Sequence, residues 1–255
     1  MARTDTGEIS WPQVHAFRLR RHHLDRPATR GQLVRVASDM CGAQAQILSA
    51  GRLSFRARTR NLRPSDVDRA LSKDRSLVAA WCMRGTRHFI PSKEFAVYSR
   101  GCHTHIGPRW TSWFVRHRWP MDTVERIVAS IGRAMDQPRT RDEILRLVTE
   151  DLGLETARKR MSRGWGNVSH TDGLVIGKRV VSMRGMIGYA CNLGLACCGP
   201  EDGSEATFVR PDAWIPGFRD LAIPDAEREL VRRYLRAYAP ATPEDFSLWA
   251  AFPLR

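Results

Sequence analysis

Long apolar stretches are absent from this 255-residue sequence. A helix that spans a membrane needs a run of roughly 18 or more apolar residues, and no such run occurs. The first ten residues also lack the apolar centre of a secretory signal peptide. We therefore expect a cytoplasmic protein with no membrane partner. Hydrophobic residues still make up 42% of the chain, which is enough for it to fold throughout its length.

Cysteine pairs of the kind that bind metals are absent as well. The six cysteines are Cys41, Cys82, Cys102, Cys191, Cys197 and Cys198, and no two of them form a C-x-x-C pair. A zinc ribbon or a thioredoxin-like redox site is therefore poorly supported. Residues 102–105 (Cys-His-Thr-His) are a local cluster of ligand types, but no second ligand pair follows at a familiar spacing. We predict reduced, buried cysteines, no metal and no cofactor.

Lysine is scarce, because only four of the 41 basic residues are lysines and the other 37 are arginines. The formal net charge is +14 and the pI is about 10.5, a balance that favours a polyanionic partner, most often nucleic acid. The planar guanidinium group of arginine matches phosphate groups and guanine edges. A bias in genome base composition is an alternative reason for the excess. Basic residues are densest between Arg52 and Arg75, where a solvated basic surface is the plainer interpretation.

Two glutamines, Gln44 and Gln46, flank Ala45 just after Gly42. A spacing of two residues places both side chains on one side of an extended backbone, but on nearly opposite sides of a helix. If the pair acts together, the segment is extended and Gly42 ends the preceding helix. A carboxamide does not titrate near neutral pH, but it can hold a water molecule and donate hydrogen bonds. The pair is a candidate catalytic site for a reaction with a good leaving group. The alternative is two surface glutamines in a loop.

Three related segments recur roughly a hundred residues apart: 27–33, 138–144 and 240–246. In each segment a threonine stands where a helix is expected to begin, and Gln, Glu or Asp follows three positions later. This arrangement is typical of a capping box. Repeats at such a distance favour tandem small domains over a solenoid.

The first unit combines helices with a hairpin. Helices are expected to begin at Ser10, Thr29, Leu48 and Ser65. The first of them is expected to carry Val14, Phe17 and Leu24 on one apolar face. Strands over 77–83 and 86–90 then form a hairpin that turns at Arg84-Gly85. Helices followed by a hairpin are typical of a winged helix, in which one helix approaches a DNA groove and the hairpin touches the neighbouring backbone.

The second unit repeats this plan. A helix over 121–134 carries an apolar stripe formed by Val124, Ile127, Val128 and Ile131. A capped helix begins at Thr140, a groove-facing helix is expected over 178–186, and a hairpin over 186–197 and 205–210. Between the units, 101–120 is rich in tryptophan and histidine. These tryptophans either stack on unpaired bases or, as we favour, lock a linker onto the neighbouring domains.

The predicted fold is mainly α with small β-hairpins, arranged as tandem winged helix-turn-helix domains. Residues 1–100 form the first winged helix with the catalytic loop, and 101–120 form the linker. Residues 121–218 form the second winged helix, and 219–255 begin an incomplete third one. The third unit has room for two helices but not for a third helix or a wing, so we expect a chain truncated at its C-terminus.

Four segments, in this order and spacing, carry a resemblance to a known family: Cys41–Gln46, Trp81–Phe89, Ala206–Trp214 and Tyr238–Phe246. Together they resemble the winged-helix DNA glycosylases of the YcaQ and AlkZ type, which repair DNA interstrand crosslinks. The similarity runs over nearly the whole chain. Members of that family normally complete a third winged helix and add a C-terminal lobe that helps to hold DNA, and this chain ends before both.

The resemblance implies a function and its catalytic residues. The family motif is a glutamine, a hydrophobic residue, and then glutamine or aspartate, which corresponds here to Gln44, Ala45 and Gln46. The implied activity is that of a monofunctional DNA glycosylase that excises N7-alkylated purines, including crosslinks, by water-mediated cleavage of the N-glycosidic bond. The implied partner is alkylated or crosslinked double-stranded DNA, and such a protein would be associated with the nucleoid. The alternatives are a winged-helix transcription regulator and an inactive DNA-binding fragment.

The candidate DNA-binding residues lie after the glutamine pair, in the predicted first hairpin and in the predicted second groove-facing helix. They are Arg52, Arg56, Arg58, Arg60, Arg63, Arg84, Arg87, His88, Lys178, Arg179 and Arg184. A regulator usually forms a symmetric dimer, whereas three non-identical units in one chain favour a monomer.

Overall fold

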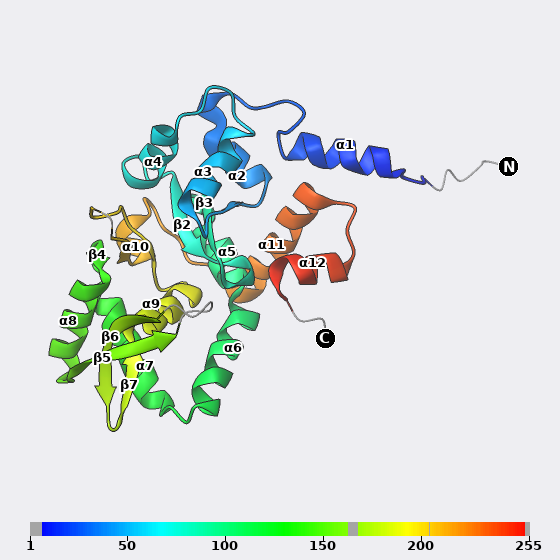
Figure 1. Ribbon diagram of the computed structural model, residues 1–255. Coiled ribbons are helices and arrows are strands. Elements are labelled where there is room, and N and C mark those ends of the chain that lie inside the picture. Colours follow the sequence, from blue (N-terminus) through cyan, green and yellow to red (C-terminus); the bar gives the residue numbers. More distant parts are fainter. Residues whose placement is uncertain (1–6, 163–167, 204, 253–255) are drawn as a thin grey trace.

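The structure, a computed structural model, describes residues 7–162, 168–203 and 205–252. Helices make up most of this part of the chain and the sheets are small, as the sequence predicted (Figure 1). The helices are α1 (Trp11–Arg21), α2 (Leu33–Asp39), α3 (Leu48–Arg56), α4 (Pro64–Ser72), α5 (Phe95–Gly101), α6 (His103–Arg116), α7 (Met121–Ala134), α8 (Arg141–Leu152), α9 (Met183–Asn192), α10 (Pro211–Trp214), α11 (Ile223–Tyr238) and α12 (Pro243–Ala250). The strands are β1 (Ala43–Gln44), β2 (Leu77–Trp81), β3 (Arg87–Pro91), β4 (Arg139–Thr140), β5 (Thr156–Ser162), β6 (Val168–Ile176), β7 (Arg179–Ser182), β8 (Cys197–Cys198) and β9 (Thr207–Val209).

A six-stranded antiparallel sheet in the order β1-β3-β2-β8-β9-β4 joins the first predicted unit to the second. The hairpin of β2 and β3 forms as predicted, but it lies inside the sheet and not at its edge. Its residues Leu77 to Ala80 are buried on both faces, so the strand requires cover on each side. The prediction of a wing that touches DNA is therefore not supported for this hairpin, and the division into tandem winged helices stays a prediction.

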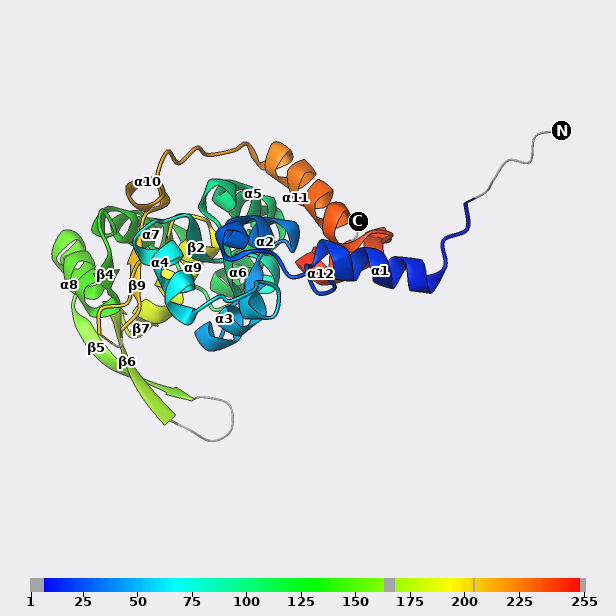
Figure 2. The ribbon, with the colours of Figure 1, turned by 90° about the horizontal axis from the view of Figure 1, so that it is seen from above.

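The second sheet, in the order β5-β6-β7, corrects two predictions made for the second unit. Residues 178–186 are not one helix, because Arg179 to Ser182 form β7 and α9 begins only at Met183. Residues 186–192, expected as part of a strand, belong to α9. The Oγ of Ser182 accepts a hydrogen bond from the N–H of Gly185, so Ser182 caps this helix. In Figure 2 the hairpin of β5 and β6 projects away from the rest of the chain.

The capping boxes of the repeat are confirmed in all three copies. The N–H of Thr29, Thr140 or Thr242 donates to the side chain of the residue three positions later, at 3.0, 2.7 and 2.9 Å respectively. The start predicted at Ser65 is wrong by two positions. Arg63 caps α4, its N–H donates to Asp66 at 2.8 Å, and Pro64 takes the first helical position.

The apolar faces of two helices differ in how well the sequence predicted them. The stripe of α7 is confirmed, because all four of its residues are buried. In the first helix only Val14 is buried, whereas Phe17 and Leu24, expected on the same face, are 40% and 42% exposed. Only the C-terminal end of α1 lies near the end of α11, where Arg18 and Arg21 donate to the carbonyls of Tyr238 and Arg236. The rest of α1 extends away from α11, so little of its surface reaches a core (Figure 1).

Most of residues 101–120, the predicted linker, form one helix, α6. Trp110 packs against Phe114 and Tyr189, and its ring centre lies 5.6 Å from that of Tyr189 in α9. Trp119 is also buried in the core of the second unit. These two tryptophans therefore lock the segment onto its neighbour, as we favoured. Trp113 differs from them, because it is 42% exposed.

Candidate active site

Gln44 lies at the end of the edge strand β1, and Gln46 lies in the bend that follows this strand. Ala43 pairs with Phe89 and Gln44 with His88, and the N–H of Ala45 donates to the carbonyl of Arg87 at 2.8 Å. Ala43 and Ala45 are fully buried, whereas both glutamines are exposed. Both glutamines are therefore exposed, one at the end of β1 and one just after it, and the alanines between and before them pack into the core beneath.

The turn that leads into β1 explains why a glycine precedes the pair. Helix α2 ends at Asp39, and the backbone then takes positive φ angles at Cys41 (58°) and Gly42 (83°). The N–H of Gly42 donates to the carbonyl of Ala37 at 2.8 Å, which closes the helix end. A Cβ at Gly42 would lie 2.7 Å from Ile90 Cγ2. Only glycine therefore fits both the conformation and the space, as the sequence predicted for the end of this helix.

Helix α3 packs directly onto the inner side of β1. A Cβ at Gly51 would lie 2.8 Å from the Cβ of Ala45 and 2.7 Å from the ring of Phe89. The small side chains at 45 and 51 thus let the helix approach the strand closely. Since β1 has only one neighbouring strand, this packing is what holds its inner face in place.

Arg87 holds the glutamine segment through three hydrogen bonds. Its N–H donates to Gln46 Oε1 at 3.1 Å, its Nε to the carbonyl of Ala45 at 3.0 Å, and its Nη2 to the carbonyl of Gln46 at 3.2 Å. Its guanidinium also lies over the ring of Trp81, 5.7 Å from the centre. The sequence marked Arg87 as a DNA contact, but in this structure the side chain fixes the backbone on which the carboxamides stand.

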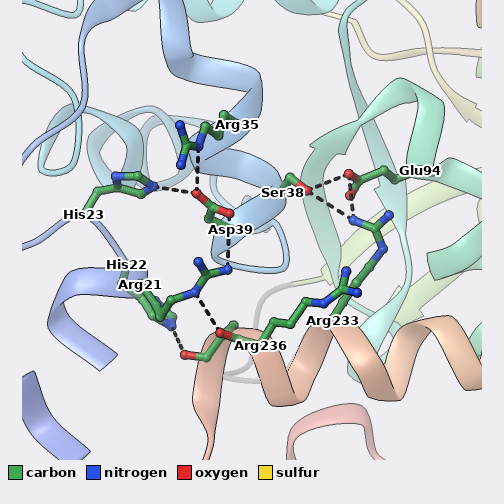
Figure 3. Close-up of polar contacts among 10 residues, drawn as sticks. Arg21, His22, His23, Arg35, Ser38, Asp39, Glu94, Arg233 and Arg236 are labelled. Atoms are coloured by element: carbon green, nitrogen blue, oxygen red, sulfur yellow. Dashed lines mark hydrogen bonds and ion pairs between the residues drawn. The ribbon is translucent and has the colours of Figure 1, made fainter. Parts of the chain in front are cut away.

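A network of polar contacts fixes α2 just before it turns into β1 (Figure 3). Asp39, the last residue of α2, accepts from His23 Nε2 at 2.9 Å and pairs with Arg21 and Arg35 at 3.4 Å each. Ser38 Oγ donates to Glu94 at 2.6 Å, and the same carboxylate pairs with Arg233 of α11 at 2.7 Å. Residues distant in the sequence therefore determine where the glutamine strand begins.

His88 is the cross-strand partner of Gln44, and it is buried with only 2% of its surface exposed. Its Nδ1 contacts the carbonyl of Thr86 at 2.9 Å. Burial lowers the pKa of His88 to about 4, with a smaller contribution from the positive charge of Arg84. A neutral, enclosed imidazole does not act as a cation toward phosphate, so the prediction of a DNA contact here is not supported by its surroundings.

Comparison with known proteins identifies the family. The family described as "DNA glycosylase AlkZ-like" matches residues 37–255. That stretch is most of the chain and includes the glutamine strand, the hairpin beside it and α11.

The chain belongs to the AlkZ-like DNA glycosylase family. The resemblance seen in the sequence is thereby confirmed. A relative described as "Interstrand DNA cross-link repair glycosylase", from Streptomyces sahachiroi, is 28% identical over 248 residues, which are 95% of this chain and 61% of the relative. The chain thus spans less than two thirds of that relative's length.

A solved structure agrees in fold. The "DNA glycosylase AlkZ" of Streptomyces sahachiroi superposes with a TM-score of 0.72 at 24% identity, covering 96% of this chain and 62% of the solved one. This likeness shows that the chain has the AlkZ fold. The glutamine strand, its glycine turn and the Arg87 contacts are thus features of a chain from this glycosylase family.

The remaining basic residues predicted to bind DNA fall into two groups. In the first unit Arg56, Arg60 and Arg63 are exposed. Arg52 instead pairs with Asp68 at 2.6 Å, and Arg58 donates to the carbonyl of Ser54 at 2.8 Å. These two arginines are therefore engaged with the protein itself.

The second group lies in the second unit and around the hairpin turn. Lys178 and Arg179 are exposed near the β6–β7 turn, where Arg179 donates to the carbonyl of His117 at 2.6 Å. Arg184 is exposed on α9, and Arg84 donates to the carbonyl of Trp249. Among the candidates, Arg87 and His88 lie on the strand that pairs with β1, and Arg87 also bonds to Ala45 and Gln46.

The described residues contain neither a cluster of metal ligands nor a helix that could cross a membrane. In that part of the chain, no three His, Cys, Asp or Glu side chains come together as a possible metal site. Cys102 is buried, which raises the pKa of its thiol well above the ordinary value, and the His105 side chain lies outside the described residues. Among the described helices, none is both long and apolar enough to cross a membrane.

Proposed function

We propose that this chain is a monofunctional DNA glycosylase that excises N7-alkylated purines from double-stranded DNA, including bases joined in interstrand crosslinks. The observation that carries the proposal is the pair of exposed glutamines at the end of β1 and in the bend after it, in a chain of the AlkZ-like family. The name of the Streptomyces sahachiroi relative, an interstrand crosslink repair glycosylase, supports the substrate class.

The chemistry of the substrate fits two neutral amides. Alkylation at N7 makes the purine cationic, so its bond to the sugar is already weak and the transition state resembles an oxocarbenium ion. The oxygen of water forms a bond to C1′ while the bond from C1′ to the purine nitrogen breaks. The electron pair of that bond neutralises the base, and the water releases its proton to solvent. The enzyme has mainly to position water and to place dipoles near the developing charge.

The structure gives the two glutamines different surroundings. Within the described residues the Gln44 carboxamide makes no hydrogen bond, so its oxygen is available to accept a hydrogen bond from the attacking water. The Gln46 oxygen already accepts from Arg87 N–H, which fixes the direction of its dipole. We infer that Gln44 orients the water and that the fixed Gln46 dipole stabilises the sugar cation. A route through a lysine Schiff base is disfavoured, because none of the four lysines lies within 25 residues of the pair in the sequence.

The test replaces both glutamines with alanine and measures release of N7-methylguanine from methylated duplex DNA in single turnover. We expect the excision rate of Gln44→Ala plus Gln46→Ala to fall at least on the order of 100-fold, the usual effect of removing a preorganised dipole. Gln137→Ala is the matched control, because Gln137 is an exposed glutamine outside the site. Unchanged excision by a folded double variant, with a melting temperature near that of the parent, would count against the proposal.

A further inference from the structure

A cavity of about 580 Å³ lies between α6, α9 and the turn that joins β2 to β3. This volume is within the roughly 300–1,000 Å³ typical of small-molecule sites. Its lining combines aromatic, basic and amide side chains, among them Arg84, Trp110, Trp113, Trp119, Arg184 and Asn192. Figure 1 shows α6 and α9 beside each other below the central sheet. The excision chemistry proposed above uses none of these side chains.

One wall of the cavity offers an aromatic surface. Trp113 is 42% exposed, and its ring stacks on His117 with centres 4.3 Å apart. Trp110 lies one helical turn earlier and is held by Tyr189. A large exposed ring at the mouth of a cavity is available to stack on a planar ligand. Stacking of a nucleobase on such a ring favours binding whatever the base, because every base has a flat aromatic face.

The floor of the cavity holds a hydrogen-bond acceptor that lacks a donor. Asn192 is 6% exposed, and its Nδ2 donates to the carbonyl of Gly188 at 2.7 Å. Its Oδ1 is buried and has no hydrogen-bond partner among the described residues. A Cβ at Gly85 would lie 3.6 Å from this oxygen, so the atom faces the glycine of the hairpin turn. An unpaired buried acceptor destabilises the protein, and a ligand that donates an N–H group to it would remove this cost.

The charge around the cavity has one sign. Arg109 and Arg184 are exposed and Arg84 is half-buried, and no described residue that lines the cavity is acidic. Aromatic stacking, an unpaired acceptor and a cationic rim together match a nucleotide: a flat base with N–H donors joined to an anionic phosphate.

We propose that this cavity binds one unpaired nucleotide of the DNA. The base stacks on Trp113, an N–H group of the base donates to Asn192 Oδ1, and the adjoining phosphate lies against Arg109 and Arg184. The inference rests on the proposed function only in taking DNA as the partner. Arg84 and Gly85 line the cavity and Arg87, two residues further on, holds Gln46, so the cavity adjoins the glutamine site.

The experiment uses unmodified DNA, so that it is independent of base excision. Fluorescence anisotropy compares a duplex carrying one unpaired guanine with the same duplex fully paired. We expect the full chain to bind the bulged duplex on the order of tenfold more tightly, as stacking of one base implies. Trp113→Ala should abolish this preference. Trp11→Ala is the matched control, because Trp11 is 69% exposed and also contacts a histidine four residues later.

A second comparison tests the role of Asn192. The unpaired guanine is replaced by purine, a base without N–H donors, and bound by the parent chain and by Asn192→Leu. The parent should prefer guanine to purine, and the variant should bind both equally. An unpaired 2-aminopurine should also lose fluorescence on binding the parent but not Trp113→Ala. Equal affinity of the parent for bulged and paired duplexes, or a preference that both variants retain, would overturn the proposal, whether or not excision of N7-methylguanine is observed.

Discussion

Arg87 and His88 are adjacent in β3, yet their side chains have opposite surroundings. Arg87 reaches the outer side and bonds to the backbone and side chain of the glutamine segment. His88 points into the protein and is buried. The sequence predicted that both residues contact DNA as cations. It shows the type of each residue, but not which face of the strand is buried in the fold. At this scale, a residue's partners determine whether its charge is available to a ligand.

The buried histidine gives the protein a specific acid sensitivity. The pKa of His88 is about 4 when folded and 6.5 when exposed, so its contribution to stability is complete above pH 6.5 and is lost as the pH falls from 6.5 to 4. At pH 5 this loss is about 2 kcal/mol.

His88→Asn keeps a donor for the Thr86 carbonyl but does not titrate. Urea titrations at pH 8 and pH 5 measure how much unfolding free energy each protein loses between these two pH values. We expect this loss to be about 2 kcal/mol smaller for the variant than for the parent. Equal losses would contradict the assignment.

Strand β1 and helix α3 show what decides structure at the scale of elements. The strand is only two residues long, so its own propensity contributes little. It is held by its register with β3 and by close packing of α3 through Gly51. A larger side chain at either contact point would push the helix away from the strand that carries both carboxamides.

Two glycine substitutions separate this packing from helix propensity. Gly51→Ala places a methyl group 2.7 Å from Phe89, so overpacking should outweigh the better helix former and destabilise the fold by about 1–3 kcal/mol. Gly132→Ala in α7 meets no atom within 4 Å and should stabilise by up to about 1 kcal/mol. Denaturant titration of both variants measures this difference. A stabilised Gly51→Ala variant would show that the contact is loose.

The whole molecule joins its predicted units through shared elements. One hydrophobic core contains Cys41 and Tyr98 of the first unit, Cys197 and Val209 of the second and Leu230 of the third. With the six-stranded sheet, this core ties the glutamine strand to the second unit. The chain as a whole carries a net charge of +14, which favours broad, salt-dependent contact with DNA.

Salt dependence distinguishes arginines that contact phosphate from arginines that serve the fold. The logarithm of affinity for a random duplex should fall linearly with the logarithm of salt concentration, by about 0.9 per phosphate contact. We expect Arg56→Ala to reduce the slope by about 0.9 and Arg58→Ala to leave it unchanged, because Arg58 donates to Ser54. Anisotropy titrations at several salt concentrations measure both slopes. A strong preference for one operator sequence would instead favour the transcription regulator.

Local chemistry in the sequence determined the three helix starts of the repeat and the glycine turn before the glutamine pair. In each copy of the repeat, a threonine with a carboxylate or carboxamide three residues later caps a helix. Two side chains two residues apart share a face whenever the backbone is extended. The family resemblance rests on four such short segments in a fixed order, and this is why the family and the mainly helical content could be predicted.

Only the tertiary structure decided which residues lie beside that pair. The pairing of β2 with β8 and the reach of Arg233 to Glu94 join positions more than a hundred residues apart. No local pattern encodes such contacts, because they depend on which apolar faces bury each other when the chain collapses. For the same reason the sequence presented His88 as a cation and residues 186–192 of α9 as a strand, and burial and helix packing decided otherwise.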